Sequence, residues 1–227
     1  MRGICNVQVV FSPGAGREGA QLTVAAIADA LDRLGHRAQV MVSGMRPVAA
    51  PTPILGPAFT IQAVPQPRQS ERPYEKELAA VDAIPRGAVI AFNAGGDTEA
   101  GIWGELLSTR AIARGGIGAV IDGGVRDVAG IGALEFPVFA TAVHAADSYG
   151  RVEVSAFEEP IVCGGVPVRP GDLIAADLDG VVVVPAEVAE ECLRDAGAKL
   201  DKEGAARAML RDEGATVRDT YARHGVL

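Results

Sequence analysis

Two adjacent charged residues, Arg126 and Asp127, follow an apolar segment and the sequence Asp122-Gly123-Gly124. Residues 117–121 are typical of a buried strand, so we expect the pair on a loop at a strand's carboxyl end, where α/β proteins place their chemistry. The guanidinium of Arg126 offers a planar fork of donors to a carboxylate or an enolate oxygen. The carboxylate of Asp127 could hold a divalent cation, and one carboxylate completed by waters suits Mg²⁺ or Mn²⁺ better than zinc. A surface ion pair accounts for the same adjacency, and both interpretations stay open at this point.

A second candidate is the segment Trp103-Gly104-Glu105-Leu106-Leu107. A helix that begins near Gly104 would present free N–H groups able to bind a carboxylate. Glu105 would then lie in the first turn, where the helix dipole favours negative charge. The alternative is structural: Trp103, Leu106 and Leu107 have the spacing of a helix face that packs on the core, and Glu105 would be solvated.

Other motifs carry less chemistry. The segment Gly14–Gly19 matches the glycine pattern of dinucleotide sites, but the next expected strand, residues 38–42, ends without the acid that would hold the ribose. A flexible glycine-rich leader over residues 1–20 is favoured instead. The three His residues and the three Cys residues lie far apart, so neither a zinc site nor a disulfide framework is indicated.

Composition excludes several classes of protein. The 227 residues carry a net charge of −8 and 4% aromatics, which argues against a basic nucleic-acid surface and a base-stacking platform. No apolar run approaches the roughly 18 residues that would span a bilayer. A reducing, cytoplasmic location is the default for such Cys usage. The length suits one domain, which we place at residues 21–227, including a C-terminal helix.

Hydrophobic periodicity predicts four helices and nine strands in an α/β order with a β-rich end. The expected helices cover residues 21–34, 74–81, a stretch from about 102 to the glycines at 115–116, and 185–210. The expected strands cover residues 38–42, 58–64, 88–92, 117–121, 136–142, 151–156, 161–163, 173–176 and 181–184. The last dozen residues are expected to fray or to dock on a neighbour.

Taken together, these segments resemble the RraA-like family, which includes the class II 4-hydroxy-4-methyl-2-oxoglutarate / 4-carboxy-4-hydroxy-2-oxoadipate aldolases. The family's hallmark is an acidic residue, then twenty residues, then Arg-Asp; here Glu105 is followed by residues 106–125 and by Arg126-Asp127. Further matching segments are Ala28–Asp32, Leu55–Thr60, Phe136–Phe139, Pro170–Ile174 and Asp179–Val181. The resemblance covers roughly residues 22–195, which is most of the chain.

The resemblance implies a fold, an assembly and a set of roles. The fold would be a layered α-β-β-α sandwich similar to the swivelling phosphohistidine-type domain, assembled as a homotrimer or hexamer with sites between subunits. Asp127 would be the metal ligand and Arg126 would contact the substrate. The segment Gly104-Glu105-Leu106-Leu107 would line the substrate, with backbone amides around the pyruvate carboxylate.

The implied activity is cleavage of a 4-hydroxy-2-oxoacid to pyruvate and a second oxoacid, with oxaloacetate decarboxylation through the same enolate. Arg126 would stabilise the enolate, and Glu105, with Asp122, would orient a water for proton transfer. The chain departs from the family at Glu105, where aldolases have Asp and the ribonuclease-regulating members have Gly. The retained acid favours an enzyme over the alternative, a regulator that binds ribonuclease E, while a metal-dependent enzyme for an unrelated oxoacid stays open.

Overall fold

One mixed sheet forms the centre of the protein. The computed structural model describes residues 22–66, 68, 71–212 and 214–226. Four parallel strands lie in the middle of the sheet: β2 (Ile54–Pro65), β3 (Val89–Trp103), β4 (Gly118–Val125) and β5 (Val138–Val143). Antiparallel strands extend it: β1 (Arg46–Ala49) beside β5, and both β6 (Val152–Phe157) and β9 (Leu173–Asp177) beside β2. Strand β10 (Gly180–Val184) pairs with β9, and β7 (Ile161–Cys163) pairs with β8 (Val166–Val168) in a separate hairpin.

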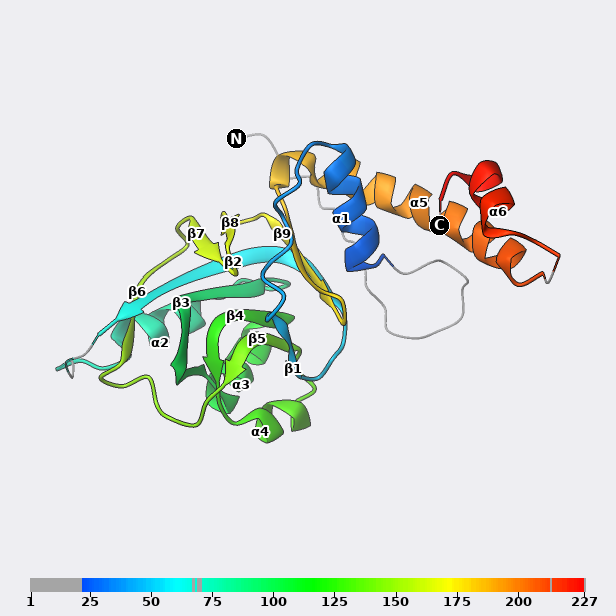
Figure 1. The fold of residues 1–227 in the computed structure, drawn as a ribbon. Helices are drawn as coiled ribbons and strands as arrows, with labels where there is room; N and C mark the ends of the chain where they lie inside the picture. Colours follow the sequence, from blue (N-terminus) through cyan, green and yellow to red (C-terminus); the bar gives the residue numbers. More distant parts are fainter. Residues whose placement is uncertain (1–21, 67, 69–70, 213, 227) are drawn as a thin grey trace.

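The helices form two groups (Figure 1). The helices α2 (Glu75–Ala83), α3 (Glu105–Arg114) and α4 (Val128–Ala133) connect or precede the parallel strands and cover one side of the sheet. The second group is α1 (Val24–Arg33), α5 (Ala189–Leu210) and α6 (Val217–His224), with the 3₁₀ turn η1 (Ala186–Val188) leading into α5. Figure 1 shows this group extending away from the sheet, with α6 lying along the far end of α5.

Three apolar cores hold these layers together. The largest lies between the sheet and α2–α4 and includes Trp103, Phe92 and Ile121. A second lies between the parallel strands and the β7–β8 hairpin, and a third joins α1 and α5 to β9 and β10. In α1 the buried residues recur at helical spacing, and Gly35 ends the helix with a φ of 87°, as its position after the last apolar residue predicts.

The structure confirms the α/β class and most expected elements. Strand β7 has the expected bounds, and the helices α1, α2, α3 and α5 lie within two to four residues of their expected limits. The finer sandwich likeness to the swivelling domain stays a prediction. The expected leader and the glycine motif within it lie outside the described residues.

Several elements differ from the expectations or were not predicted. Residues 38–42 form no strand, and only Val40 makes an isolated bridge, with Val182. Ile102 and Trp103 belong to the end of β3 rather than to the next helix, since β3 continues through Asn93–Gly96 where a turn was expected. Of the two alternatives for the last dozen residues, fraying is wrong, because Val217–His224 form α6, whose start is capped by Thr216; docking on a neighbour stays a prediction. The short strands β1 and β8 were not predicted, since four and three residues leave little periodicity to detect.

No helix in the part of the chain that the structure describes is long and apolar enough to cross a membrane.

Candidate functional site

Gly104 and the Arg126-Asp127 pair meet where β3 and β4 end. The ladder between these strands continues to Trp103 and Val125, and the Arg126 amide donates to the Trp103 carbonyl at 2.9 Å. A Cβ atom on Gly104 would lie 2.7 Å from Asp127 Oδ2 and 3.3 Å from Arg126 Cγ. Real side chains do not tolerate so short a contact, so only glycine lets the start of α3 lie against this carboxylate.

Glu105 lies beside this group of residues. It is the first residue of α3 and is exposed to solvent. A Cβ atom on Gly130 of α4 would lie 2.8 Å from Glu105 Oε2, so the Glu105 side chain extends over α4. Because Asp127 is the residue from which α4 begins, the two carboxylates lie on neighbouring helix starts. The structure therefore brings together Gly104, Glu105, Arg126 and Asp127, as the sequence predicts.

Asp127 has a strained backbone and an uncommitted side chain. Its φ of 57° and ψ of 32° are left-handed, which a non-glycine residue adopts at a cost of about 1–3 kcal/mol. Although it occupies the N-cap of α4, its side chain makes no capping hydrogen bond. The side chain is 49% exposed, and Arg126 Nε lies 3.7 Å from Oδ2. The strained backbone makes Asp127 a candidate functional residue.

The donor set suits a hard cation with few protein ligands. In the described residues, no group of three or more His, Cys, Asp or Glu side chains could by itself hold a metal ion. Mg²⁺ and Mn²⁺ do not need such a cage, because Mg²⁺ in particular keeps several waters and takes one or two carboxylates. The Asp127 side chain is about half exposed, and Glu105 is the first residue of the adjoining α3. These residues fit the predicted cation.

The start of α3 is rigid and its first amides are not capped by a side chain. Gly104 has none to offer, and Ser108 Oγ and the Ser108 amide both donate to the Gly104 carbonyl, at 2.9 and 3.1 Å. The buried Trp103 indole donates to Ser108 Oγ at 2.8 Å. The helix start near Gly104 is thereby confirmed. The structural expectation that Leu106 faces the core is wrong, since Leu106 is 80% exposed, whereas Leu107 is partly buried against the core.

Arg126 lies between two carboxylates. Besides Asp127, Asp147 Oδ1 lies 3.6 Å from Arg126 Nη1, and the Arg126 side chain is 37% exposed. Both distances exceed a hydrogen bond, so the guanidinium is held by charge while its N–H donors stay available to a ligand.

Asp147 belongs to a cluster that the sequence did not reveal. The Tyr74 hydroxyl donates to Asp147 Oδ2 at 3.0 Å. Burial alone would raise the pKa of Asp147, but the Tyr74 hydrogen bond and the Arg126 charge hold it below its ordinary value. Burial, and then the Asp147 charge, raise the pKa of the nearby Glu77 from 4.5 to about 7. No motif links these residues, because 70 positions separate Glu77 from Asp147 along the chain.

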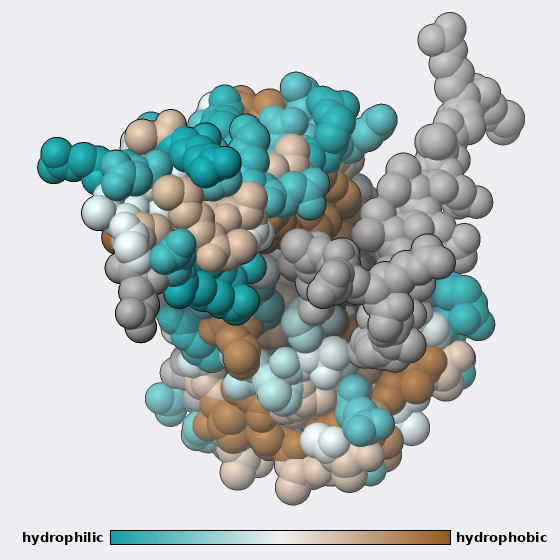
Figure 2. All heavy atoms as spheres, turned by 90° about the vertical axis from the view of Figure 1, so that its right-hand side faces the viewer, coloured by the Kyte–Doolittle hydropathy of each residue, from teal (hydrophilic) through white to brown (hydrophobic). Residues whose placement is uncertain are grey.

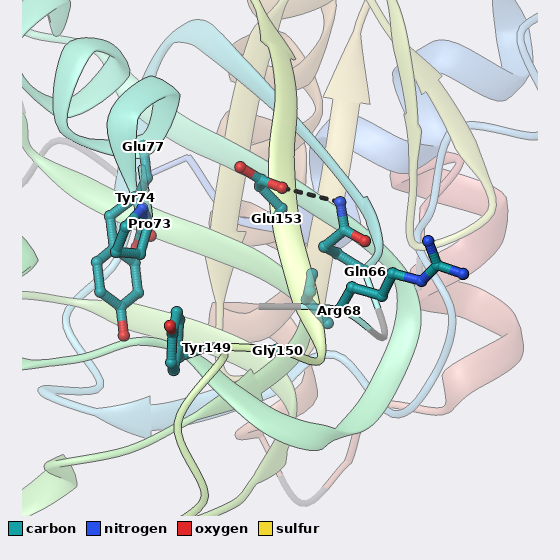
Figure 3. Close-up of a pocket in the computed structure, with 9 residues that line it drawn as sticks. Gln66, Arg68, Pro73, Tyr74, Glu77, Tyr149, Gly150 and Glu153 are labelled. Atoms are coloured by element: carbon teal, nitrogen blue, oxygen red, sulfur yellow. Dashed lines mark hydrogen bonds between the residues drawn. The ribbon is translucent and has the colours of Figure 1, made fainter. Parts of the chain in front are cut away.

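A pocket adjoins this cluster (Figure 3). Tyr74 and Glu77 form part of its wall, and the Tyr74 and Tyr149 rings lie side by side, with their centroids 6.1 Å apart. On the other side Gln66 donates to Glu153 at 3.1 Å. The pocket is also lined by Arg68, Pro73, Gly150 and Val152.

Asp122 lies apart from the other predicted residues. It is buried within β4, and its Oδ2 accepts a hydrogen bond of 2.8 Å from the Gly164 amide in the β7–β8 turn. Four residues of extended chain, roughly 13 Å, separate it from Arg126. Cys163, beside this turn, is fully buried, and burial raises the pKa of its thiol, which agrees with a packing role.

Comparison with known proteins points to one family. The family model described as RraA-like, Aldolase/RraA, matches residues 24–183. A Halalkalibacterium halodurans protein named "Putative 4-hydroxy-4-methyl-2-oxoglutarate aldolase" is 35% identical over 184 residues, covering 81% of this chain and 82% of that protein. The solved structure of Streptomyces coelicolor RraAS2, described as an unusual member of the RNase ES inhibitor RraA protein family, superposes with a TM-score of 0.72. It is 31% identical and covers 81% of this chain and 90% of RraAS2.

A third relative is much longer. DlpA of Legionella pneumophila is 32% identical over 167 residues, which are 74% of this chain but 27% of DlpA. This chain therefore spans about a quarter of that relative's length.

Proposed function

Because the chain belongs to the Aldolase/RraA family, we propose that it is a divalent-metal-dependent class II lyase. Its reaction would cleave a 4-hydroxy-2-oxoacid of the 4-hydroxy-4-methyl-2-oxoglutarate type to pyruvate and a second oxoacid, with oxaloacetate decarboxylation as a second activity. The observation that carries this proposal is the convergence of Glu105, Arg126 and Asp127 on Gly104. The 35% identity to a protein with an aldolase name supports the same reaction class.

Arg126 would stabilise the charge that the reaction creates. Cleavage next to a 2-oxo group leaves an enolate, and the guanidinium can donate to its oxygen because its N–H groups form only ion pairs with Asp127 and Asp147. A donor aimed at a developing oxyanion typically contributes about 2.7–4 kcal/mol to the barrier difference. The two carboxylates keep the guanidinium in place while this charge develops.

The start of α3 would bind the substrate's carboxylate. The first amides of the helix point outward at its N-terminus, and Gly104 lets this helix start lie directly against Asp127. Leu106, exposed on the first turn, and Leu107 would contact the carbon chain of the substrate. The same amides and Arg126 offset the net charge of −8 at the point where an anionic oxoacid binds.

Asp127 would hold the cation, with waters as its other ligands. When bound, Mg²⁺ or Mn²⁺ supplies Lewis-acid polarisation of the 2-oxo group. Glu105 would orient a water that accepts the 4-hydroxyl proton and later returns a proton to the enolate carbon. The proton-transfer role of Asp122 stays a prediction, and its bond to Gly164 gives it a structural role as well.

An assembly of identical subunits forms part of the proposal. Leu106 is 80% exposed and Val143, at the end of β5, is 59% exposed, so the described residues of one subunit leave these apolar side chains largely uncovered. Figure 2 shows brown hydrophobic patches in the lower half of the visible face, the half that holds the β5 and α4 end of the molecule in Figure 1. A trimer or hexamer would bury such surface.

Pyruvate release from 4-hydroxy-4-methyl-2-oxoglutarate, related 4-hydroxy-2-oxoacids and oxaloacetate tests the proposal. We expect turnover with Mg²⁺ or Mn²⁺ and its loss with EDTA. Turnover that survives EDTA would contradict the metal dependence, and no pyruvate from any of these acids would contradict the lyase.

A second candidate function is regulation of a ribonuclease, favoured by the 31% identity to RraAS2. Ribonuclease E activity would be measured with and without this protein, alongside pyruvate release. Inhibition by a protein that releases no pyruvate would favour the regulator over the lyase.

A further inference from the structure

The Arg126 guanidinium has one charged neighbour from its own loop and one from a distant loop. Asp127 lies 3.7 Å from Nε, and Asp147, twenty-one positions later in the chain, lies 3.6 Å from Nη1. An arginine side chain has several rotatable bonds and loses up to about 2 kcal/mol of rotamer entropy when it is fixed. Two anions on different edges of the guanidinium restrict the plane of the donor fork more than either alone.

Asp147 is itself held by a set of donors. The Tyr74 hydroxyl donates to Oδ2 at 3.0 Å, and the Ser148 hydroxyl lies 3.4 Å from Oδ1. The Tyr149 amide also points at Oδ1, at 3.5 Å. Tyr74 has a left-handed φ of 65°, a strained conformation for a bulky residue at the start of α2. Tyr74 therefore holds Oδ2, while Ser148 and Tyr149 contact Oδ1, the oxygen that also faces Arg126.

The loop that carries Asp147 is anchored to the sheet beside Arg126. The Gly101 amide in β3 donates to the Ala146 carbonyl at 2.7 Å, and Arg151 Nη1 donates to the Asp147 carbonyl at 2.9 Å. A Cβ atom on Gly101 would lie 2.5 Å from the His144 carbonyl oxygen and 2.9 Å from Arg126 Cβ. Glycine at this position lets the loop approach Arg126 closely enough for the ion pair.

We propose that Asp147 is a positioning residue for Arg126 and that the Tyr74 hydroxyl holds Asp147 in place. The proposal rests on the proposed function, in which Arg126 donates to the enolate oxygen. The raised pKa of Glu77 supports the proposal. A Glu77 carboxyl that is largely protonated below pH 7 leaves Asp147 as the charged partner of Arg126 on this side.

Kinetics of Asp147→Asn and Tyr74→Phe test the proposal. Asparagine keeps the shape of residue 147 but loses the charge that orients Arg126, and we expect kcat to fall ~10–100-fold with a smaller change in KM, as for other partners that orient an active-site residue. Phenylalanine at position 74 removes one hydrogen bond, and we expect a fall of ~3–10-fold in kcat. The matched control is Asp82→Asn, which breaks the exposed ion pair with Arg110 on α2 and α3 and should leave kcat unchanged.

A double-mutant cycle separates positioning from a general loss of structure. If Asp147 acts through Arg126, Asp147→Asn has little further effect in the Arg126→Lys background. Effects that multiply independently, or a kcat for Asp147→Asn within twofold of the unmodified protein, would overturn the proposal.

Crystal structures of the two variants keep the inference separate from the proposed reaction. We expect the Arg126 guanidinium to be displaced or present in several conformers in Asp147→Asn and, to a smaller extent, in Tyr74→Phe. If the unmodified protein releases no pyruvate, the proposed function fails and these structures alone decide the positioning role. An unchanged, well-ordered guanidinium in both variants would refute it.

Discussion

The two sides of Arg126 were assembled in different ways. On one side, Gly104, Glu105 and Asp127 come from the ends of two neighbouring parallel strands, where motifs in the sequence already point. On the other side, Asp147 and Tyr74 come from loops without a motif and meet only through packing. In the proposed function, the first side would supply reacting and binding groups, while the second would orient one of them.

The largest effect is expected at the residue that both sides share. Arg126→Lys keeps the charge but loses the planar fork, so we expect kcat to fall ~10²–10³-fold, as when an oxyanion donor is removed. Steady-state pyruvate release measures it. A near-normal rate would mean that Arg126 only pairs with its two carboxylates, and the distinction between the two sides would disappear.

Gly104→Ala tests the close approach of Gly104 to the Asp127 carboxylate. The new Cβ would lie 2.7 Å from Asp127 Oδ2, so Asp127 must shift, and we expect cation affinity and kcat to fall ~10-fold or more. Titration of activity with Mg²⁺ measures both. The control is Gly197→Ala on α5, where no heavy atom lies within 4 Å of the new Cβ. It should keep activity and gain about 0.5–1 kcal/mol of stability.

Variants of Asp122 test whether the functional residues on the Gly104–Asp127 side of Arg126 include a residue further back along β4. Asp122→Ala leaves the buried Gly164 amide without its acceptor, and we expect a loss of about 1–3 kcal/mol in the free energy of unfolding. Asp122→Asn keeps an oxygen acceptor and should lose less. Urea denaturation measures the difference, and equal losses for the two variants would contradict the structural role. A fall of more than 10-fold in kcat for Asp122→Asn would support its predicted part in proton transfer.

Glu77 gives the smallest expected effect. It lies near Asp147, on the side of Arg126 that is formed by loops. Its folded-state pKa of about 7 lies above the ordinary 4.5, so the folded protein holds a proton that the unfolded chain has already released. Stability therefore falls as pH rises from about 4.5 to 7, and Glu77→Gln removes this dependence. We expect the variant to gain stability relative to the unmodified protein between pH 5 and pH 8, measured by urea denaturation at both values. A constant difference would mean that Glu77 titrates normally.

The fold was predictable wherever the apolar pattern was long. The buried run of β4 and the helical spacing of α1 indicated their elements. Strand β3 extends beyond its expected end because the ladder with β4 skips Gly95 and Gly96, which have left-handed φ values, and resumes at Asp97. The site was predictable where its residues are joined by a single helix and strand, as Glu105 and Arg126 are by α3 and β4. It was not predictable for Tyr74 and Asp147, whose contact depends on how a loop packs against Gly101.

The anchoring of Gly101 has a consequence for motion. The Gly101 amide bonds to Ala146 within a stretch of β3 that also pairs with β4, so the loop beside Arg126 is tied directly to the central sheet. We therefore expect slow amide hydrogen exchange at Gly101, close to the rate set by global unfolding. Turnover would then be gated from the solvent side of Leu106 and Asp127, and the wall that carries Asp147 would act as the fixed half of the site throughout the catalytic cycle.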